Sequence, residues 1–535
     1  MWLEGEPRRA LTHFLAAAAA DPGSLPPLRR AAECLVVLGL ASDARRMLQH
    51  ARRVVGRRPI WFDLARARVL SKGGLRSSSI SARTSEDFVR AAVLWRMAGR
   101  SDREAGALRR ALRLAPDDLE AMIRLGWWAR RAGQSRQAVG LFQRSVASHP
   151  EYLMGYVQEA FSWIDMGRYD EARLRIQMAR QQAPANLDLA IVAWRIALAV
   201  GRSDRARAVL SSLASYHGAP YRLFRAHRLA DQGQWREAIV GLDQVSSPAD
   251  AADAQALLLR AALAHGRRRE ALDRFGRLVA LGGSVPQLGD VVQRVVRYGF
   301  CREALGIIKK SVHLPDDRHR TWRCRRMGYR ILARSYLEAS CGDRNWSRRS
   351  LGVVHWNCGT QRGLGYLMAV VADRAGWMQR AWRIVSALIA REPDDASALN
   401  LYGYTMANHG RAAESVGILR IAHLLDPLDP AVADSYGWAL LLAGRRREAE
   451  GLLAFAWRLL PVDGEIAAHR GWAVEVAAGA SNRVGRVNCR EGDGMVQAGR
   501  WYRRALRLRV APEVRRWVRM RLAAFAACRG TGRKL

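Results

Sequence analysis

Residues 119–150 have the sequence LEAMIRLGWWARRAGQSRQAVGLFQRSVASHP, and the positions of glycine, alanine and proline in this segment decide the fold. A first helix is expected to end at Gly133, because glycine can adopt the left-handed conformation that closes a helix. A second helix then begins and carries a small residue, Ala138, where the two helices must approach closely. Pro150 stops the second helix and turns the chain. The segment therefore predicts one pair of packed helices.

The same pattern of glycine, small residue and proline repeats at a constant interval of 34 residues in two stretches of the chain. Three classes of residue follow this period, which is hard to produce by chance. The glycines are Gly99, Gly133, Gly167, Gly201, Gly376, Gly410 and Gly444, and the prolines are Pro116, Pro150, Pro184, Pro393, Pro427 and Pro461. One helix pair cannot bury its apolar face alone, so the repetition predicts neighbouring pairs that stack into a superhelix.

Other parts of the chain follow the pattern less closely. Gly39 with Ala44 predicts a full pair, and Gly233, Gly266 and Gly299 continue the array. Residues 75–85 are rich in serine and do not suggest a second helix. We expect a helix at 320–339, a loop at 341–346, and closing helices at 501–510 and 513–527. The expected regions are degenerate N-terminal repeats with a serine-rich break (1–84), a repeat array (85–313), an irregular helical connector (314–361), a regular array (362–479), and an insertion with capping helices (480–535).

These residues resemble the signature of the tetratricopeptide repeat (TPR) family. Leu125, Gly126, Ala138, Phe142 and Pro150 occupy the signature positions in one copy. Gly437, Ala449 and Pro461 occupy them in a later copy. The resemblance covers most of the chain. It implies an all-α fold, a right-handed superhelical solenoid of antiparallel helix pairs with roughly a dozen repeats, irregular segments and a concave groove for a partner.

The C-terminal part is similar to a narrower group, the bacterial outer-membrane TPR lipoproteins, which include adaptors for periplasmic proteases and assembly factors. The similarity is carried by residues 398–404, 434–438 and 465–469. The chain as given has no lipoprotein signal, so the membrane anchor of that group is not carried over. We expect a cytoplasmic protein as the sequence stands, or one of the outer membrane or periplasm if an upstream signal is missing. No segment has the 18 or so uncharged apolar residues that a membrane helix needs.

The formal net charge of +38 comes almost entirely from arginine, since lysine occurs only at Lys72, Lys309, Lys310 and Lys534. Selection for positive charge normally uses both cations. We therefore favour a coding bias as its origin over selection for a polyanion. The charge remains available to steer acidic partners.

Seven scattered cysteines do not suggest a disulfide framework, and we expect buried or unpaired thiols in a reducing compartment. Cys324, Cys341 and Cys358 are evenly spaced, but only His355 and Cys358 have the spacing of a zinc-ligand pair. Gly363 and Gly365 lack the third glycine of a dinucleotide loop. No motif pairs a nucleophile with a base. The sequence thus predicts no catalytic residue, no metal site, no cofactor and no enzyme activity.

Partner contacts are expected on the groove face of the first helices. In the family, positions 2, 5, 9, 12 and 13 of each repeat line this face. Position 9 is Trp127, Phe161 and Arg195 in one array, and Tyr404, Trp438 and Trp472 in the other. Further candidates are the polar residues Asn400, Asn408 and Asp434 and the basic residues Arg130 and Arg131. Alternatively, the aromatic rings pack between neighbouring helices and the arginines lie on a solvated face.

Two classes of function remain open. The first is a scaffold or adaptor that holds a protein or peptide in the groove. The second is a basic repeat protein that binds RNA. Position 5 is apolar in Val89, Ile123, Val157 and Ile191, which cannot read base edges, so only nonspecific phosphate contacts are expected.

Overall fold

The computed structural model describes residues 7–530 apart from 22–23, 56–60, 71–74, 76–79, 214, 217, 241, 243–244, 246–247, 282–286, 315–323, 360–361 and 479–492. Within these ranges the regular structure is helical and no strand occurs. The chain forms two compact units. The first contains residues 1–179, 312–339 and 343–395, and the second contains 180–311, 340–342 and 396–535.

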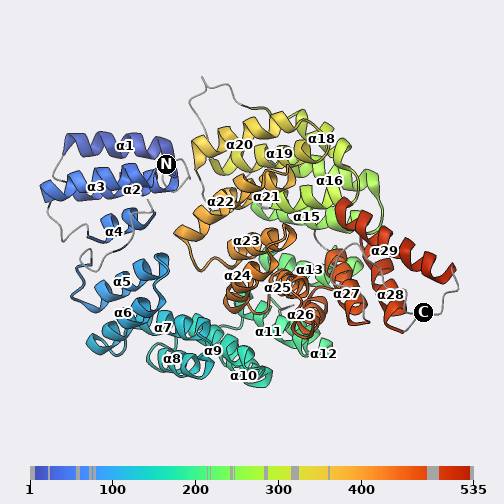
Figure 1. Cartoon of the computed structure of the whole chain (residues 1–535), viewed down its shortest axis with the longest axis horizontal. Coiled ribbons are helices and arrows are strands. Elements are labelled where there is room, and N and C mark those ends of the chain that lie inside the picture. The colour runs from blue at the N-terminus through green and yellow to red at the C-terminus, as the bar shows by residue number, and fades with distance from the viewer. Residues whose placement is uncertain are drawn as a thin grey trace. The chain divides into compact units, whose positions relative to one another are not determined.

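The first unit is built mainly from these helices: α1 (Pro7–Ala20), α2 (Leu25–Val37), α3 (Ala41–Val55), α4 (Trp61–Leu70), α5 (Ser85–Met97), α6 (Ser101–Leu114), α7 (Leu119–Arg131), α8 (Ser135–Ser148), α9 (Leu153–Asp165), α10 (Tyr169–Gln182), the π-helix η4 (Cys324–Gly328), α19 (Tyr329–Cys341), α20 (Arg344–Cys358), α21 (Arg362–Arg374) and α22 (Met378–Arg391). Within it, α5 to α9 pack in sequence order, each helix against the next (Figure 1).

The second unit is built mainly from these helices: α11 (Leu187–Ala199), α12 (Ser203–Ser212), α13 (Ala219–Asp231), α14 (Trp235–Ala238), α15 (Pro248–Ala264), α16 (Arg268–Ala280), α17 (Gln287–Arg297), α18 (Cys301–Lys309), α23 (Ala396–Asn408), α24 (Ala412–Leu425), α25 (Pro430–Leu442), α26 (Arg446–Leu459), α27 (Gly464–Ala477), α28 (Asp493–Arg507) and α29 (Pro512–Gly530). Here α23 to α27 form the regular stack, and α28 packs against α27.

The repeated glycines end the first helices as the sequence predicts. All seven glycines of the 34-residue series have positive φ, from 68° at Gly99 to 84° at Gly444. First helices begin at Leu119, Leu153 and Leu187, and at Ala396, Pro430 and Gly464, which makes the position 9 candidates named above the ninth residue of each helix. Aspartate caps several of them; the carboxylate of Asp118, for example, accepts a hydrogen bond from the Ala121 amide at 2.9 Å. The expected fold class, an all-α array of stacked helix pairs, is confirmed.

Close packing inside a pair explains the signature glycine of the first helix. A Cβ atom at Gly126 would lie 2.5 Å from the ring of Phe142, which stands on the second helix of the same pair. Gly403 faces Leu419 and Gly437 faces Leu453 in the same way. A larger residue at this position would push the helices apart, because interiors are close-packed.

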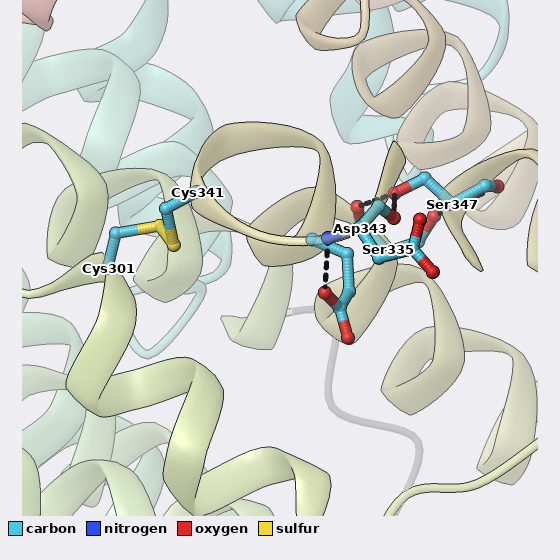
Figure 2. The surroundings of a disulfide bond; sticks show 6 residues. Cys301, Ser335, Cys341, Asp343 and Ser347 are labelled. Atoms are coloured by element: carbon cyan, nitrogen blue, oxygen red, sulfur yellow. Dashed lines mark hydrogen bonds between the residues drawn. A yellow bond between two sulfur atoms is a disulfide. The ribbon is translucent and has the colours of Figure 1, made fainter. Parts of the chain in front are cut away.

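The expected loop at 341–346 is wrong. Helix α19 runs to Cys341, and α20 begins at Arg344 after a turn of two residues. Asp343 caps α20, because its carboxylate accepts the amide of Asn345 at 2.8 Å. The amide of Asp343 in turn donates to the Glu338 carboxylate at 2.8 Å. The hydroxyl of Ser347 donates to the carbonyl of Ser335 at 2.8 Å and ties the two helices together (Figure 2).

The other irregular segments lie partly outside the described residues. Of the expected helix at 320–339, residues 320–323 are outside, and the remainder is η4 followed by α19. The expected closing helix at 501–510 starts earlier than predicted, because α28 begins at Asp493 and ends at Arg507. Most of the serine-rich segment lies outside, and its described residues Leu75 and Ile80–Thr84 are not helical.

The expectation of unpaired thiols is wrong for four cysteines. Disulfides join Cys301 to Cys341, with Cα atoms 6.2 Å apart, and Cys324 to Cys358, with Cα atoms 5.6 Å apart. Each bond joins the start of one helix to the end of another; Cys301 opens α18 and Cys341 closes α19 (Figure 2). The pairing depends on the packing of these helix ends, which the spacing along the chain does not reveal. Cys34 is buried and unpaired.

No helix in the described part of the chain is long and apolar enough to cross a membrane.

Candidate partner-binding site

The first unit contains a cavity of about 310 Å³. Helices α5, α6 and α7 line it, together with the end of α22 and the turn that follows, and every lining residue belongs to this unit. Trp127 and Arg124 come from α7, and Arg96 comes from α5. Residues 391–395 close the opposite side. Two first helices and a proline turn from a distant repeat therefore share one cavity.

Four of the eight charged side chains that line this cavity form a cluster of two arginines and two carboxylates. Arg131 pairs with Glu104 and also contacts Oδ1 of Asp394 at 3.3 Å. Arg96 contacts the same Asp394 oxygen from Nη2 at 2.9 Å. Burial raises the pKa of Glu104, although Arg131 and Arg96 oppose this. Burial and the neighbouring Arg96 lower the pKa of Arg131, against the pull of Glu104 and Asp394. Two guanidinium groups are thus held side by side by two carboxylates.

The neighbouring candidates Arg130 and Phe161 are buried between helices. The guanidinium of Arg130, 3% exposed, donates to both carboxylate oxygens of Asp165 at 2.7 and 3.0 Å. The same group lies 5.6 Å from the centre of the Phe161 ring. Both side chains join α7 to α9, and little of either surface is open to a partner. Trp127 is the aromatic candidate of this array that lines the cavity.

In the second unit, arginines of the first helices again meet acidic turns. Arg195 on α11 lies 3.5 Å from Asp426 and 3.8 Å from Asp429, which flank the turn before α25. Arg297 on α17 lies 3.2 Å from Glu465 and 3.7 Å from Asp463, at the start of α27. Burial raises the pKa of Asp426 despite the nearby Arg195.

The three aromatic candidates of the later array meet in one cluster of the second unit. The rings of Trp438 and Trp472 lie 4.9 Å apart, and Trp438 stacks on His469 at 4.0 Å. The Tyr404 ring lies 6.5 Å from the His469 ring. Trp517 of α29 packs beside both tryptophans, which are only 8% and 3% exposed. These two rings therefore pack between helices and offer little surface to a partner.

Polar candidates surround this aromatic cluster. Asn408 accepts a hydrogen bond from Nε1 of Trp438 at 2.8 Å, and Nδ1 of His469 lies 2.9 Å from the Asp434 carboxylate. The Tyr404 hydroxyl donates to Glu465 at 2.8 Å. Burial, with the negative charge of Glu465, raises the pKa of Tyr404 well above its ordinary value. The side-chain oxygen of Asn400 is buried and has no hydrogen-bond partner within the described ranges.

The sequence therefore gives the candidate arginines and aromatic residues but not the side chains that they contact. Arg96, Glu104, Asp394, Arg297 and Glu465 were not among the candidates. The Pro393-Asp394-Asp395 turn is visible in the sequence, yet its contact with Arg131 spans 263 residues. The helical period gives no information about pairs so far apart. That the candidates contact a partner stays a prediction.

The described residues contain no group of three His, Cys, Asp or Glu side chains arranged to hold a metal ion. Cys324, Cys341 and Cys358, the cysteines considered as ligands, are all in disulfides.

Comparison with known proteins gives neighbours of low similarity. No family model and no curated protein matches the chain. Among solved structures, the TPR protein TTC0263 of Thermus thermophilus is 22% identical, with 30% of this chain and 89% of that chain covered and a TM-score of 0.24. Pseudomonas aeruginosa pilF is 18% identical, with coverage of 37% and 91% and a TM-score of 0.27. The yeast Tom70 structure is 11% identical, with coverage of 83% and 96% and a TM-score of 0.32.

At these scores the neighbours carry no argument about function. They also do not show the similarity of the C-terminal part to outer-membrane lipoproteins, which stays a prediction. The fold rests on the helix pairs themselves, with glycine closing the first helix, a small residue at the crossing and proline ending the second. This chain has a TPR-like, all-α repeat fold.

Proposed function

We propose that this protein is a non-catalytic scaffold that binds a protein or peptide partner on the groove face of its first helices. The observation that carries the proposal is the 310 Å³ cavity, where Trp127 stands beside guanidinium groups that already hold a carboxylate. A large aromatic ring and arginines are the residues that most often anchor protein interfaces. Guanidinium groups also bind carboxylates with defined geometry.

Variants of the cavity test this proposal. Trp127→Ala and Arg124→Gln remove cavity-lining side chains, and Arg124 pairs with Glu120 on its own helix. The matched control is Arg144→Gln, an exposed arginine of the second helix α8. Tagged chains are used to capture partners after nuclease treatment, and bound proteins are quantified. We expect the amount of captured partner to fall by about tenfold or more in each of the two cavity variants and not in the control, because the loss of an interface hot spot has an effect of this size. Equal capture by all four chains contradicts the proposal.

Nonspecific RNA binding is the second candidate, favoured by exposed arginines of the second helices. Arg103 lies 4.7 Å above the Trp95 ring and Arg109 lies 5.1 Å from the Trp128 ring. Exposed guanidinium groups suit phosphate contacts, whereas the two rings beneath them are only 6% and 8% exposed and offer little area for base stacking. In this case the affinity for a homopolymeric RNA falls steeply with salt, as counterion release requires. Loss of all captured partners on nuclease treatment would favour this candidate over the scaffold.

We also propose that the protein resides in an oxidising compartment. Two disulfides close loops of 40 and 34 residues, and such bonds persist outside the reducing cytosol. This is compatible with the periplasmic alternative rather than the cytoplasmic one. Fractionation of cells that express the full-length gene tests it; recovery of the chain only in the cytoplasm, with reduced cysteines, contradicts it.

A further inference from the structure

Acidic turns recur as partners of the groove arginines. In the first unit Asp394, in the turn before α23, contacts Arg96 and Arg131. In the second unit Asp429 and Asp463, which directly precede α25 and α27, lie 3.8 Å from Arg195 and 3.7 Å from Arg297. Each turn comes from a later repeat, and each arginine stands on a first helix of the earlier array. The earlier first helices therefore bind one kind of chemical group, a carboxylate presented on a turn.

The contact in the first unit differs from the others because it borders the cavity. Its inner pair is buried, with Arg131 9% and Glu104 7% exposed. Its outer members are more open, with Arg96 22% and Asp394 28% exposed. Asp394 stands on a turn rather than inside a helix. The Asp394 carboxylate can therefore leave while the Arg131–Glu104 pair stays in place.

The charges of the cluster explain what such a departure would leave behind. With Asp394 present, two guanidinium groups face two carboxylates. Without Asp394, the cavity lining holds more positive than negative charge beside Trp127: four arginines (Arg96, Arg124, Arg131 and Arg391) and three carboxylates (Glu104, Glu392 and Asp395). Like charges brought close in a partly buried site attract an anion strongly, because screening by water is weak there. The vacated site would fit a carboxylate on an extended or turned peptide.

We infer that the Glu392–Asp395 turn is a resident internal ligand of this cavity, and that a partner must offer an acidic segment that displaces Asp394. The inference rests on the proposed function, since it takes this cavity as the binding face. A tethered ligand competes at a high effective concentration. If the turn occupies the site nine-tenths of the time, a free competitor binds about tenfold more weakly than to the empty site.

The experiment uses the full chain and a fluorescent peptide with the sequence of residues 391–396, REPDDA. The variant Asp394→Asn keeps the shape of the side chain and removes its charge. The matched control is Asp117→Asn, because Pro116-Asp117-Asp118 is an equivalent repeat turn and Asp117 is exposed. We expect the peptide to bind Asp394→Asn at least about tenfold more tightly than it binds wild type or Asp117→Asn. Equal binding to all three chains overturns the inference.

Two further measurements make the result specific. A peptide with both aspartates replaced by asparagine is expected to show no gain, and adding Arg96→Gln to Asp394→Asn is expected to abolish most of the gain. If either keeps the full gain, the inference is overturned. Circular dichroism checks that Asp394→Asn folds, and Asp394→Ser replaces it if it does not.

The failure of this inference is distinguishable from the failure of the proposed function. Partner capture that depends on Trp127 and Arg124, without a peptide gain in Asp394→Asn, overturns the internal ligand alone. A peptide gain, with partner capture unaffected by the cavity variants, overturns the scaffold proposal and leaves the internal contact supported.

Discussion

His469 lies in the core of the second unit, where its ring stacks on Trp438 and its Nδ1 faces Asp434. Burial alone would lower the pKa of this imidazole. The charge of Asp434 and the hydrogen bond to it, together with Glu465 and Asp463, outweigh burial and raise the pKa above its ordinary value. His469 is therefore a residue whose protonation is coupled to the folded state.

This coupling predicts a definite pH dependence. A histidine with a raised pKa in the folded state stabilises the fold fully below its unfolded pKa of about 6.5. The contribution is lost as the pH rises through the folded-state value, by about 1.4 kcal/mol for each unit of difference. We expect the free energy of unfolding to fall between pH 6 and pH 9, as measured by denaturant titration. The fall should be smaller in His469→Gln and unchanged in the control His13→Gln, an exposed residue of α1. A fall of the same size in His469→Gln would contradict this interpretation.

Gly126 shows how one missing Cβ atom sets the distance between two helices. A methyl group there would lie 2.5 Å from the Phe142 ring, which is fully buried. We expect Gly126→Ala to lower the free energy of unfolding by about 1–3 kcal/mol, the usual cost of overpacking. Thermal or denaturant unfolding measures it.

The matched control is Gly140→Ala on α8, where no described atom of another residue lies within 4 Å of the added methyl. Alanine favours a helix interior over glycine by about 0.5–1 kcal/mol. This variant is therefore expected to be more stable than wild type. If both variants were less stable than wild type, the loss in Gly126→Ala could not be assigned to its contact with Phe142.

At the scale of elements, the disulfides fasten the helices between residues 301 and 358. The bonds close loops of 40 and 34 residues. In the chain-entropy model each closure destabilises the unfolded chain by about 4 kcal/mol. We expect Cys341→Ser or Cys358→Ser to lower the free energy of unfolding by about 2–4 kcal/mol, measured without reductant.

Peptide mapping without reduction checks the pairing directly, and it should recover Cys301 linked to Cys341 and Cys324 linked to Cys358. Cys34 provides the control, because burial raises the pKa of its thiol to about 12 and it should resist alkylation in the folded chain. Full alkylation of Cys301, Cys324, Cys341 and Cys358 before any reduction would exclude the bonds.

Residues with a local role were predictable from the sequence at this scale. Gly133 and Asp118 act within a few positions of themselves, so their effects on helix ends follow from residue type alone. The repeat spacing of Trp438 and Trp472 was visible in the sequence, but their burial beneath Trp517 of α29 was not. Asp343 was missed as a cap because the expected loop hid the start of α20. Long-range partners such as Asp394 depend on how stacks curve back, which no repeat period encodes.

The charge of the whole molecule gives a prediction about salt. With a net charge of +38, repulsion among surface arginines opposes the folded state. Salt screens this repulsion, as the screening length falls from about 30 Å at 0.01 M to 8 Å at 0.15 M. Salt also weakens exposed ion pairs such as Arg46–Asp43, but each is worth only about 0–1 kcal/mol. We expect the melting temperature to rise between about 20 and 200 mM sodium chloride. A fall would mean that ion pairs outweigh repulsion.

The contact between Arg131 and Asp394 joins residues 263 positions apart. At about 5–20 residues per second, a ribosome takes roughly 13–50 s to add the intervening chain. Throughout that interval the guanidinium groups of Arg96 and Arg131 have no Asp394 carboxylate to contact, because Asp394 has not yet been synthesised. Until Asp394 is added, the growing chain therefore carries two arginines that lack one of their final ion-pair partners. A stretch of slowly translated codons before Asp394 would lengthen this interval.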